Sequence, residues 1–159
     1  MSDEAVRVHR FSKFENAEEI HPFGTPARVM LRSEDTGGDL SALLVMHGPG
    51  EGPPPHFHTG QSEYFFVVEG RYEMTVAGET RALEPGDMAF VPPDTIHSFR
   101  NITDAPSKML DWSLPGGQDH YFREIDQMGK GGRGFDEDMM QRLAETNARH
   151  DAHFVKQKP

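Results

Sequence analysis

The chain contains no cysteine among its 159 residues. Disulfide bridges, thiolate catalysis and cysteine-based zinc sites are therefore excluded. Long apolar runs are also missing, and none approaches the roughly 18 residues that a helix needs to span a bilayer. The amino-terminal segment MSDEAVRVHRFSKFE lacks the apolar stretch of a secretory signal. We therefore expect a cytoplasmic protein that makes no membrane contact.

Positive charge is scarce, because 16 lysines and arginines are set against 26 aspartates and glutamates. The formal net charge of -10 repels phosphate backbones and anionic lipid surfaces, so nucleic acid is not an expected partner. Hydrophobic residues make up 35% and charged residues 26%, a balance typical of globular proteins. A chain of this length predicts one domain over residues 1–159.

Glycine and proline divide the first 117 residues into short apolar segments. Segments of this kind, bounded by turn residues, are typical of strands. Many short strands at regular spacing favour an all-β sandwich or closed barrel, here over about residues 25–115. The predicted strands are Ala27–Arg32, Leu40–Met46, Glu63–Glu69, Arg71–Ala77, Thr80–Leu83, Met88–Val91, Thr95–Asn101 and Lys108–Ser113.

The pattern changes after Gly117, where helical segments are predicted at Gln118–Gln127 and Asp136–His150. Three acidic residues at the start of the second segment suit the positive end of a helix dipole. A glycine-rich break at Gly129–Gly134 separates the two segments. We interpret residues 118–153 as a short C-terminal helical appendage packed on the barrel. A lid over the barrel mouth is the alternative use of this segment.

Candidate metal ligands lie in the stretch from residue 50 to residue 101. His56 and His58 are two positions apart, and residues i and i+2 of an extended backbone project from the same face. Glu63 opens the next apolar run, and His97 lies in a later strand beyond a proline-rich turn. A barrel that closes on itself can bring these four side chains to one interior point.

These residue types suit a divalent transition metal. Neutral imidazole binds Fe, Ni, Cu and Zn, while a carboxylate adds an oxygen ligand and cancels one positive charge. Three nitrogens and one oxygen leave two positions of an octahedral shell for other ligands, which distinguishes a working site from a closed structural one. The plain alternatives are two histidines in an exposed loop, a solvated carboxylate and a turn histidine. The spacing of all four favours a shared ion, and the predicted ligands are His56, His58, Glu63 and His97.

The other histidines lack ligand spacing, so a structural role is expected for His47 and a surface position for His9, His21, His120, His150 and His153. Large apolar side chains of the predicted strands are expected to be mostly core, namely Phe57, Phe65, Met74, Phe90, Phe99, Met109 and Trp112. Tyr64 and Phe66 alternate to the opposite face, where they would pack between sheets or at a dimer interface.

The same stretch resembles the paired signature motifs of the cupin superfamily. Its first half has the glycine, the HxH pair, the glutamate and the closing glycine of the first motif, as Gly50, His56, His58, Glu63 and Gly70. Its second half has the glycine, proline, histidine and asparagine of the second motif, as Gly86, Pro92, His97 and Asn101. One position departs, because Asp94 stands where the family usually has glycine. Aspartate tolerates left-handed turn conformations, so we expect the turn to be kept.

This resemblance implies a cupin-type double-stranded β-helix, or jelly-roll barrel, that binds one divalent transition metal: Fe, Ni, Mn, Cu or Zn. Within the superfamily the chain is most similar to small bacterial cupins that resemble quercetinase, the flavonol dioxygenase. The similar segments are PPPHFH, LPGGQDHYFREI and AETNARHDAHFV. By that resemblance Glu63 is both ligand and catalytic base, and no organic cofactor is implied.

The implied function is a metal-dependent dioxygenase that acts on a small, largely apolar or aromatic molecule. A non-redox metal-dependent cyclase, isomerase or lyase is the first alternative, in which the metal polarises a carbonyl. A non-catalytic ligand-binding cupin is the second, although pure binding does not require an open metal. Barrels of this kind often pair edge to edge, so a homodimer is expected.

Overall fold

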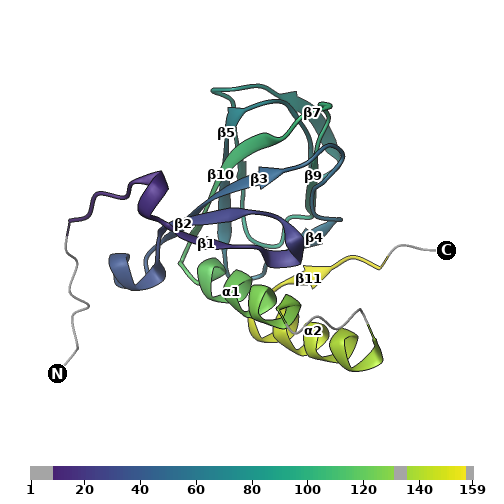
Figure 1. The fold of residues 1–159 in the computed structure, drawn as a ribbon. Helices are drawn as coiled ribbons and strands as arrows, with labels where there is room; N and C mark the ends of the chain where they lie inside the picture. Colours follow the sequence, from purple (N-terminus) through teal and green to yellow (C-terminus); the bar gives the residue numbers. More distant parts are fainter. Residues whose placement is uncertain (1–8, 131–135, 157–159) are drawn as a thin grey trace.

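The computed structural model describes residues 9–130 and 136–156, which form two antiparallel sheets facing each other (Figure 1). The six-stranded sheet has the order β1-β2-β3-β10-β5-β8, with strands Glu18–Ile20, Ala27–Leu31, Ser41–His47, Ser107–Leu114, Ser62–Glu69 and Met88–Val91. The five-stranded sheet has the order β11-β4-β9-β6-β7, with strands His153–Phe154, His56–Phe57, His97–Asn101, Tyr72–Val76 and Glu79–Leu83. The expected all-β barrel is confirmed.

Alternation of side chains builds the barrel interior. Along β5 the side chains of Glu63, Phe65 and Val67 are buried, and along the paired β10 those of Met109 and Asp111 are buried. The apolar core between the sheets contains Phe65, Val67, Tyr72, Met74, Val91, Phe99 and Met109. Residues that share the inward face are therefore apolar in the middle of the barrel and polar near Glu63.

The observed strands differ from the predicted ones by two residues at most, wherever a strand was predicted. Three short strands, β1, β4 and β11, were not predicted, because two or three residues are too few to show an alternating pattern. The expectation that Phe90 and Trp112 belong to the core is wrong. Both lie on the outward face of the six-stranded sheet, where Trp112 stacks on Tyr64 and Phe90 is 53% exposed.

Two positions show why the motif needs its turn residues. Asp94 adopts a left-handed backbone with φ of 60°, so the turn expected at this position is kept without glycine. Gly70 has φ of 84°, and a Cβ atom built there would lie 1.8 Å from Ser107 Oγ. Only glycine fits that close approach between β5 and the start of β10.

Two helices, α1 (Gln118–Gly129) and α2 (Glu137–Arg149), follow the last barrel strand, in agreement with the predicted helical segments. Figure 1 shows them side by side at one end of the barrel. They bury a separate cluster that contains Tyr121, Ile125, Met128, Met139 and Ala152. The predicted glycine-rich break falls largely on residues 131–135, outside the described residues. Three short 3-10 helices are also present, Phe14–Asn16 (η1), Pro22–Gly24 (η2) and Ser33–Thr36 (η3).

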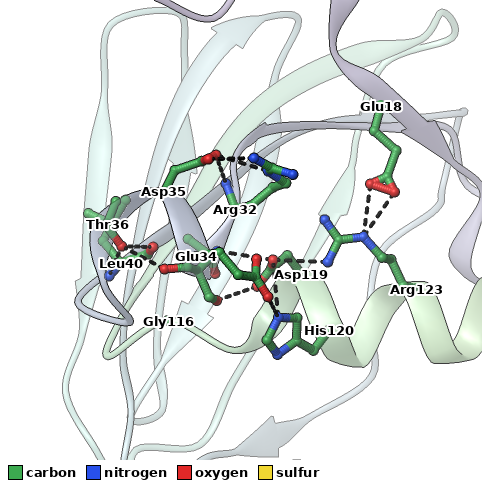
Figure 2. A network of polar contacts seen from close by, with 12 residues as sticks. Glu18, Arg32, Glu34, Asp35, Thr36, Leu40, Gly116, Asp119, His120 and Arg123 are labelled. Carbon is green, nitrogen blue, oxygen red and sulfur yellow. Dashed lines mark hydrogen bonds and ion pairs between the residues drawn. The ribbon is translucent and has the colours of Figure 1, made fainter. Parts of the chain in front are cut away.

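A buried carboxylate attaches α1 to the barrel. Asp119 accepts hydrogen bonds from the backbone nitrogen of Ser33 at 3.1 Å and from its hydroxyl at 2.5 Å. Arg123, one turn later, bridges Asp119 and Glu18 (Figure 2). These contacts fix the start of the helix against η3. Among the described residues, no helix is both long and apolar enough to cross a membrane.

Candidate metal centre

The four predicted ligands meet inside the barrel. His56 lies in β4, His58 directly after it, Glu63 in β5 and His97 in β9. One ligand atom from each of the four side chains lies within 4.8 Å of the others, and all four residues are buried. Strand pairing explains part of this, because His56 and His97 are register partners across β4 and β9. Glu63 reaches the same point from the opposite sheet.

Each histidine ring is held by a backbone carbonyl. The Nδ1 atoms of His56, His58 and His97 lie 2.9 Å from the carbonyl oxygens of Pro54, Asp151 and Thr95, in that order. A carbonyl oxygen only accepts hydrogen bonds, so each Nδ1 carries the proton. In a neutral ring the Nε2 atom is then a bare lone pair, which is the form that binds a metal.

The bare Nε2 atoms face a carboxylate. His58 Nε2 lies 2.9 Å from Glu63 Oε1, and His97 Nε2 lies 3.1 Å from Glu63 Oε2. Two acceptors at such distances repel each other unless protons or a metal cation lie between them. The angle at His58 is also wrong for a hydrogen bond, which leaves its buried Nε2 without a donor–acceptor partner among the described residues. Three nitrogens and one carboxylate around that point fit a divalent transition metal.

The electrostatics of the cluster favour a bound cation. Burial, followed by the charge of His97, lowers the pKa of His56 to about 4, so this imidazole is neutral at pH 7. Burial would raise the pKa of Glu63, but close contact with the His58 and His97 imidazoles outweighs it and lowers the pKa to about 2. Burial likewise opposes the charged form of His58, yet contact with Glu63 raises its pKa overall. The site therefore holds an ionised carboxylate that requires positive charge.

A segment from the C-terminus completes the surroundings of His58. Asp151 supplies the carbonyl that holds His58 Nδ1, and its carboxylate accepts hydrogen bonds from Thr59 N, Thr59 Oγ1 and Gly60 N at 2.7–3.0 Å. The next residues form β11, which pairs with β4, and the Phe154 ring stacks on His56 with centroids 5.5 Å apart. Sequence reasoning missed this contribution, because Asp151 lies 93 residues from His58.

Two further polar side chains near the site were also missed. Asp111 lies on the inward face of β10, and burial, followed by the charge of Glu63, raises its pKa well above the usual range. Its position could have been found from its alternation with Met109 and Ser113. Gln118, the first residue of α1, is buried and donates to Glu63 through Nε2. No local pattern identifies this contact.

Residues expected to lie outside the site are mostly elsewhere. His47 is buried and forms a 2.9 Å hydrogen bond with the Tyr72 hydroxyl, which is a structural contact. His120 is exposed, as expected, but its ligand atom lies within 4.8 Å of those of Glu34 and Asp119 (Figure 2). A cavity of about 290 Å³ lies between η2, α1 and α2, and its lining contains none of the four predicted ligands.

Comparisons with known proteins agree with the fold and the motifs. Residues 43–113 match the family model described as a cupin domain. Quercetin 2,3-dioxygenase of Bacillus subtilis is 30% identical over 99 residues, which cover 62% of this chain and 29% of that protein. Polyketide synthase CurC of Streptomyces cyaneus is 34% identical over 99 residues, covering 60% of this chain and 64% of that one. The alignments thus span less than two thirds of either relative.

A solved structure shows the same architecture. An RmlC-like cupin from Shewanella frigidimarina superposes with a TM-score of 0.59 at 23% identity, over 72% of this chain and 97% of that one. At this identity the likeness concerns the fold alone. Together with the family match over residues 43–113, the converging HxH, glutamate and histidine residues identify this segment of the chain as a cupin domain.

Proposed function

We propose that this chain is a metal-dependent dioxygenase that acts on a small, largely apolar aromatic molecule carrying a hydroxyl group. The observation that carries the proposal is the convergence of one ligand atom from each of three imidazoles with the Glu63 carboxylate inside the barrel, where the Nε2 atoms of His58 and His97 face that carboxylate. The similarity to a quercetin 2,3-dioxygenase over 62% of this chain supports the choice of reaction. A divalent transition metal held there would supply Lewis acidity and, where the ion is redox-active, electron exchange with dioxygen.

The chain's own residues prepare the site for a hydroxylated substrate. Pro54, Asp151 and Thr95 hold the three rings through their carbonyls, so the Nε2 atoms keep fixed directions. Glu63 is 2% exposed, and the surrounding protein excludes water from its carboxylate. An ionised carboxylate in that position can accept the proton of a substrate hydroxyl, so Glu63 is the proposed catalytic base.

A second candidate function is non-redox cyclisation, isomerisation or elimination at the same site. The specific observation in its favour is the similarity to a polyketide synthase component, at 34% identity over 60% of this chain. Here Glu63 would move a proton on a substrate whose carbonyl is polarised by the metal. The two candidates share every ligand and differ in their need for dioxygen.

Metal content and oxygen uptake distinguish the candidates. Purified protein should contain about one transition metal per chain by elemental analysis. Apoprotein reconstituted separately with Fe, Ni, Mn, Cu and Zn is then mixed with a panel of flavonols that includes quercetin, and dissolved oxygen is recorded. The dioxygenase proposal expects uptake with at least one redox-active ion, abolished in Glu63→Gln and retained in the exposed control His9→Ala. Absence of uptake with all five ions would contradict it, and product formation without uptake would favour the non-redox candidate.

A further inference from the structure

Gln118 places an amide beside the metal centre from outside the matched cupin segment. It is the first residue of α1, and it is only 6% exposed. Its Nε2 donates to Glu63 Oε1, the same carboxylate oxygen that lies 2.9 Å from His58 Nε2. Nε2 also lies 3.3 Å from Gln61 Oε1. The amide therefore sits immediately next to the point where the predicted ligands meet.

The nitrogen and the oxygen of the Gln118 amide differ in their hydrogen bonding. Both N–H groups have acceptors, on Glu63 and on Gln61, whereas the carbonyl Oε1 is buried with no hydrogen-bond partner among the described residues. Exchanging the oxygen and nitrogen would point the carbonyl at two other acceptors, so the partners fix the orientation. A buried carbonyl without a donor is uncommon in folded proteins and marks a place where a donor is missing.

The position of Gln118 is fixed by its neighbours. Asp119, the next residue, is fully buried and bound to Ser33, and Arg123 ties the same turn to Glu18 (Figure 2). On the barrel side, Gln61 Nε2 donates to the Pro115 carbonyl at 3.0 Å. The start of α1 is therefore held from both sides, which keeps the backbone of Gln118 in place beside the metal centre.

We propose that Gln118 is a positioning residue for Glu63 and that its free carbonyl accepts a hydrogen bond from a hydroxyl of the bound molecule. The inference rests on the proposed function for its substrate class, which it narrows to molecules with a second hydroxyl beside the one that binds the metal. The first role uses the two N–H groups, and the second uses Oε1. The α1 helix thereby contributes to substrate choice as well as to folding.

The positioning role is tested without any substrate. Co²⁺ is loaded into the full-length wild type, into Gln118→Met and into the control Gln141→Met, which replaces an exposed glutamine of α2. Methionine keeps the length of the side chain and removes the amide, and Gln118→Ala serves as the second variant if Gln118→Met fails to fold by circular dichroism. We expect altered visible absorption bands of bound Co²⁺ in the Gln118 variant, because Glu63 loses its donor, and an unchanged spectrum in the control.

The acceptor role is tested with two probe ligands that differ at one hydroxyl. Catechol retains the second hydroxyl, whereas 2-methoxyphenol carries a methyl group in place of that proton. Binding of each to the Co²⁺ proteins is followed by the same absorption bands. Wild type and Gln141→Met should prefer catechol, and Gln118→Met should lose about fivefold in catechol affinity, as expected for one neutral hydrogen bond, with 2-methoxyphenol affinity unchanged.

Different outcomes would overturn the two roles separately. A Gln118→Met spectrum identical to that of wild type would overturn the positioning role. Equal loss of affinity for both probes, no loss, or no binding of either probe to wild type would overturn the acceptor role. Neither measurement on Gln118 involves oxygen. A lack of dioxygenase activity would therefore reject the proposed function, while the Co²⁺ spectra and the probe affinities would still test the roles of Gln118.

Discussion

Each proposed metal ligand is oriented by a hydrogen-bond partner that is not itself a proposed ligand. The identities of His56, His58, Glu63 and His97 could be predicted from the sequence, because extended backbone spacing and motif order are local properties. The backbone carbonyls that set the ring tautomers could not be predicted, because every residue has a carbonyl and the sequence does not indicate which of them contacts a ring. The same holds for Gln118, which reaches Glu63 from 55 residues away.

Removing one imidazole should remove the metal. We expect His56→Ala to weaken binding of Zn²⁺ by more than about 100-fold, because even the loss of a ligand's outer partner costs about 10- to 100-fold. Competition with a chromophoric chelator measures the affinity, and elemental analysis measures the occupancy. The matched control is His9→Ala, an exposed histidine. Full occupancy in His56→Ala would remove His56 from the ligand set.

Elements that carry no catalytic motif position the site. The long barrel strands could be predicted because each is a short apolar segment bounded by turn residues, as Ser62–Glu69 of β5 is followed by Gly70. The two-residue strand β11 could not, because it exists only through pairing with β4. Asp151 combines a left-handed backbone, φ 58°, with four hydrogen bonds to Thr59 and Gly60, and so links β11 to the loop after His58.

Substitutions that weaken the hydrogen bonds between Asp151 and the loop after His58 should lower the metal affinity without changing a ligand. Asp151→Asn keeps a residue that tolerates positive φ but loses charge-assisted hydrogen bonds, whereas Asp151→Ala loses the bonds and strains the backbone. We expect a graded loss of Zn²⁺ affinity, small in the first and about 10- to 100-fold in the second. The control is Asp104→Ala, an exposed aspartate in the turn between β9 and β10. Equal Zn²⁺ affinity in the wild type, both Asp151 variants and the control would show that the Asp151 contacts do not contribute to metal binding.

The attachment of α1 should depend on pH. Burial would raise the pKa of Asp119, but hydrogen bonds from Ser33 and the charges of His120 and Arg123 lower it below the usual 3.8. A depressed pKa stabilises the fold above pH 3.8, and this contribution disappears as the pH falls through the lower folded-state value. Asp119→Asn should therefore lower the free energy of unfolding by about 1–3 kcal/mol at pH 7.

Urea unfolding of the wild type and Asp119→Asn, each at pH 7 and at pH 3, measures this dependence. The difference between the two proteins should shrink at the lower pH, where Asp119 itself begins to be protonated. A difference that is constant across this range would show that the charge of Asp119 does not anchor the helix.

The whole molecule presents an apolar outer face on the six-stranded sheet. Met88 and Phe90 are 54% and 53% exposed, and Tyr64 lies between Phe90 and Trp112 with ring centroids 5.0 Å and 5.4 Å away. The sequence predicted the outward direction of Tyr64 but placed Phe90 and Trp112 in the core, because residue type alone does not decide which face of a strand is covered. Exposed clusters of this kind mark interaction sites.

We propose that two copies of the chain pair through this face. Each copy carries a net charge of -10, so pairing should tighten as added salt screens the repulsion between them. Light scattering coupled to size exclusion should give a dimer mass, and Phe90→Lys should give a monomer with an unchanged circular dichroism spectrum. A monomeric wild type at high salt and micromolar concentration would contradict the proposal.

The central claim is that one metal ion lies between His56, His58, Glu63 and His97. Anomalous diffraction from a crystal of the metal-loaded protein tests it most directly. The account predicts a single strong peak about 2.0–2.2 Å from the three Nε2 atoms and from a Glu63 oxygen. A peak at Glu34, Asp119 and His120 instead, or no peak between the four predicted ligands, would contradict it.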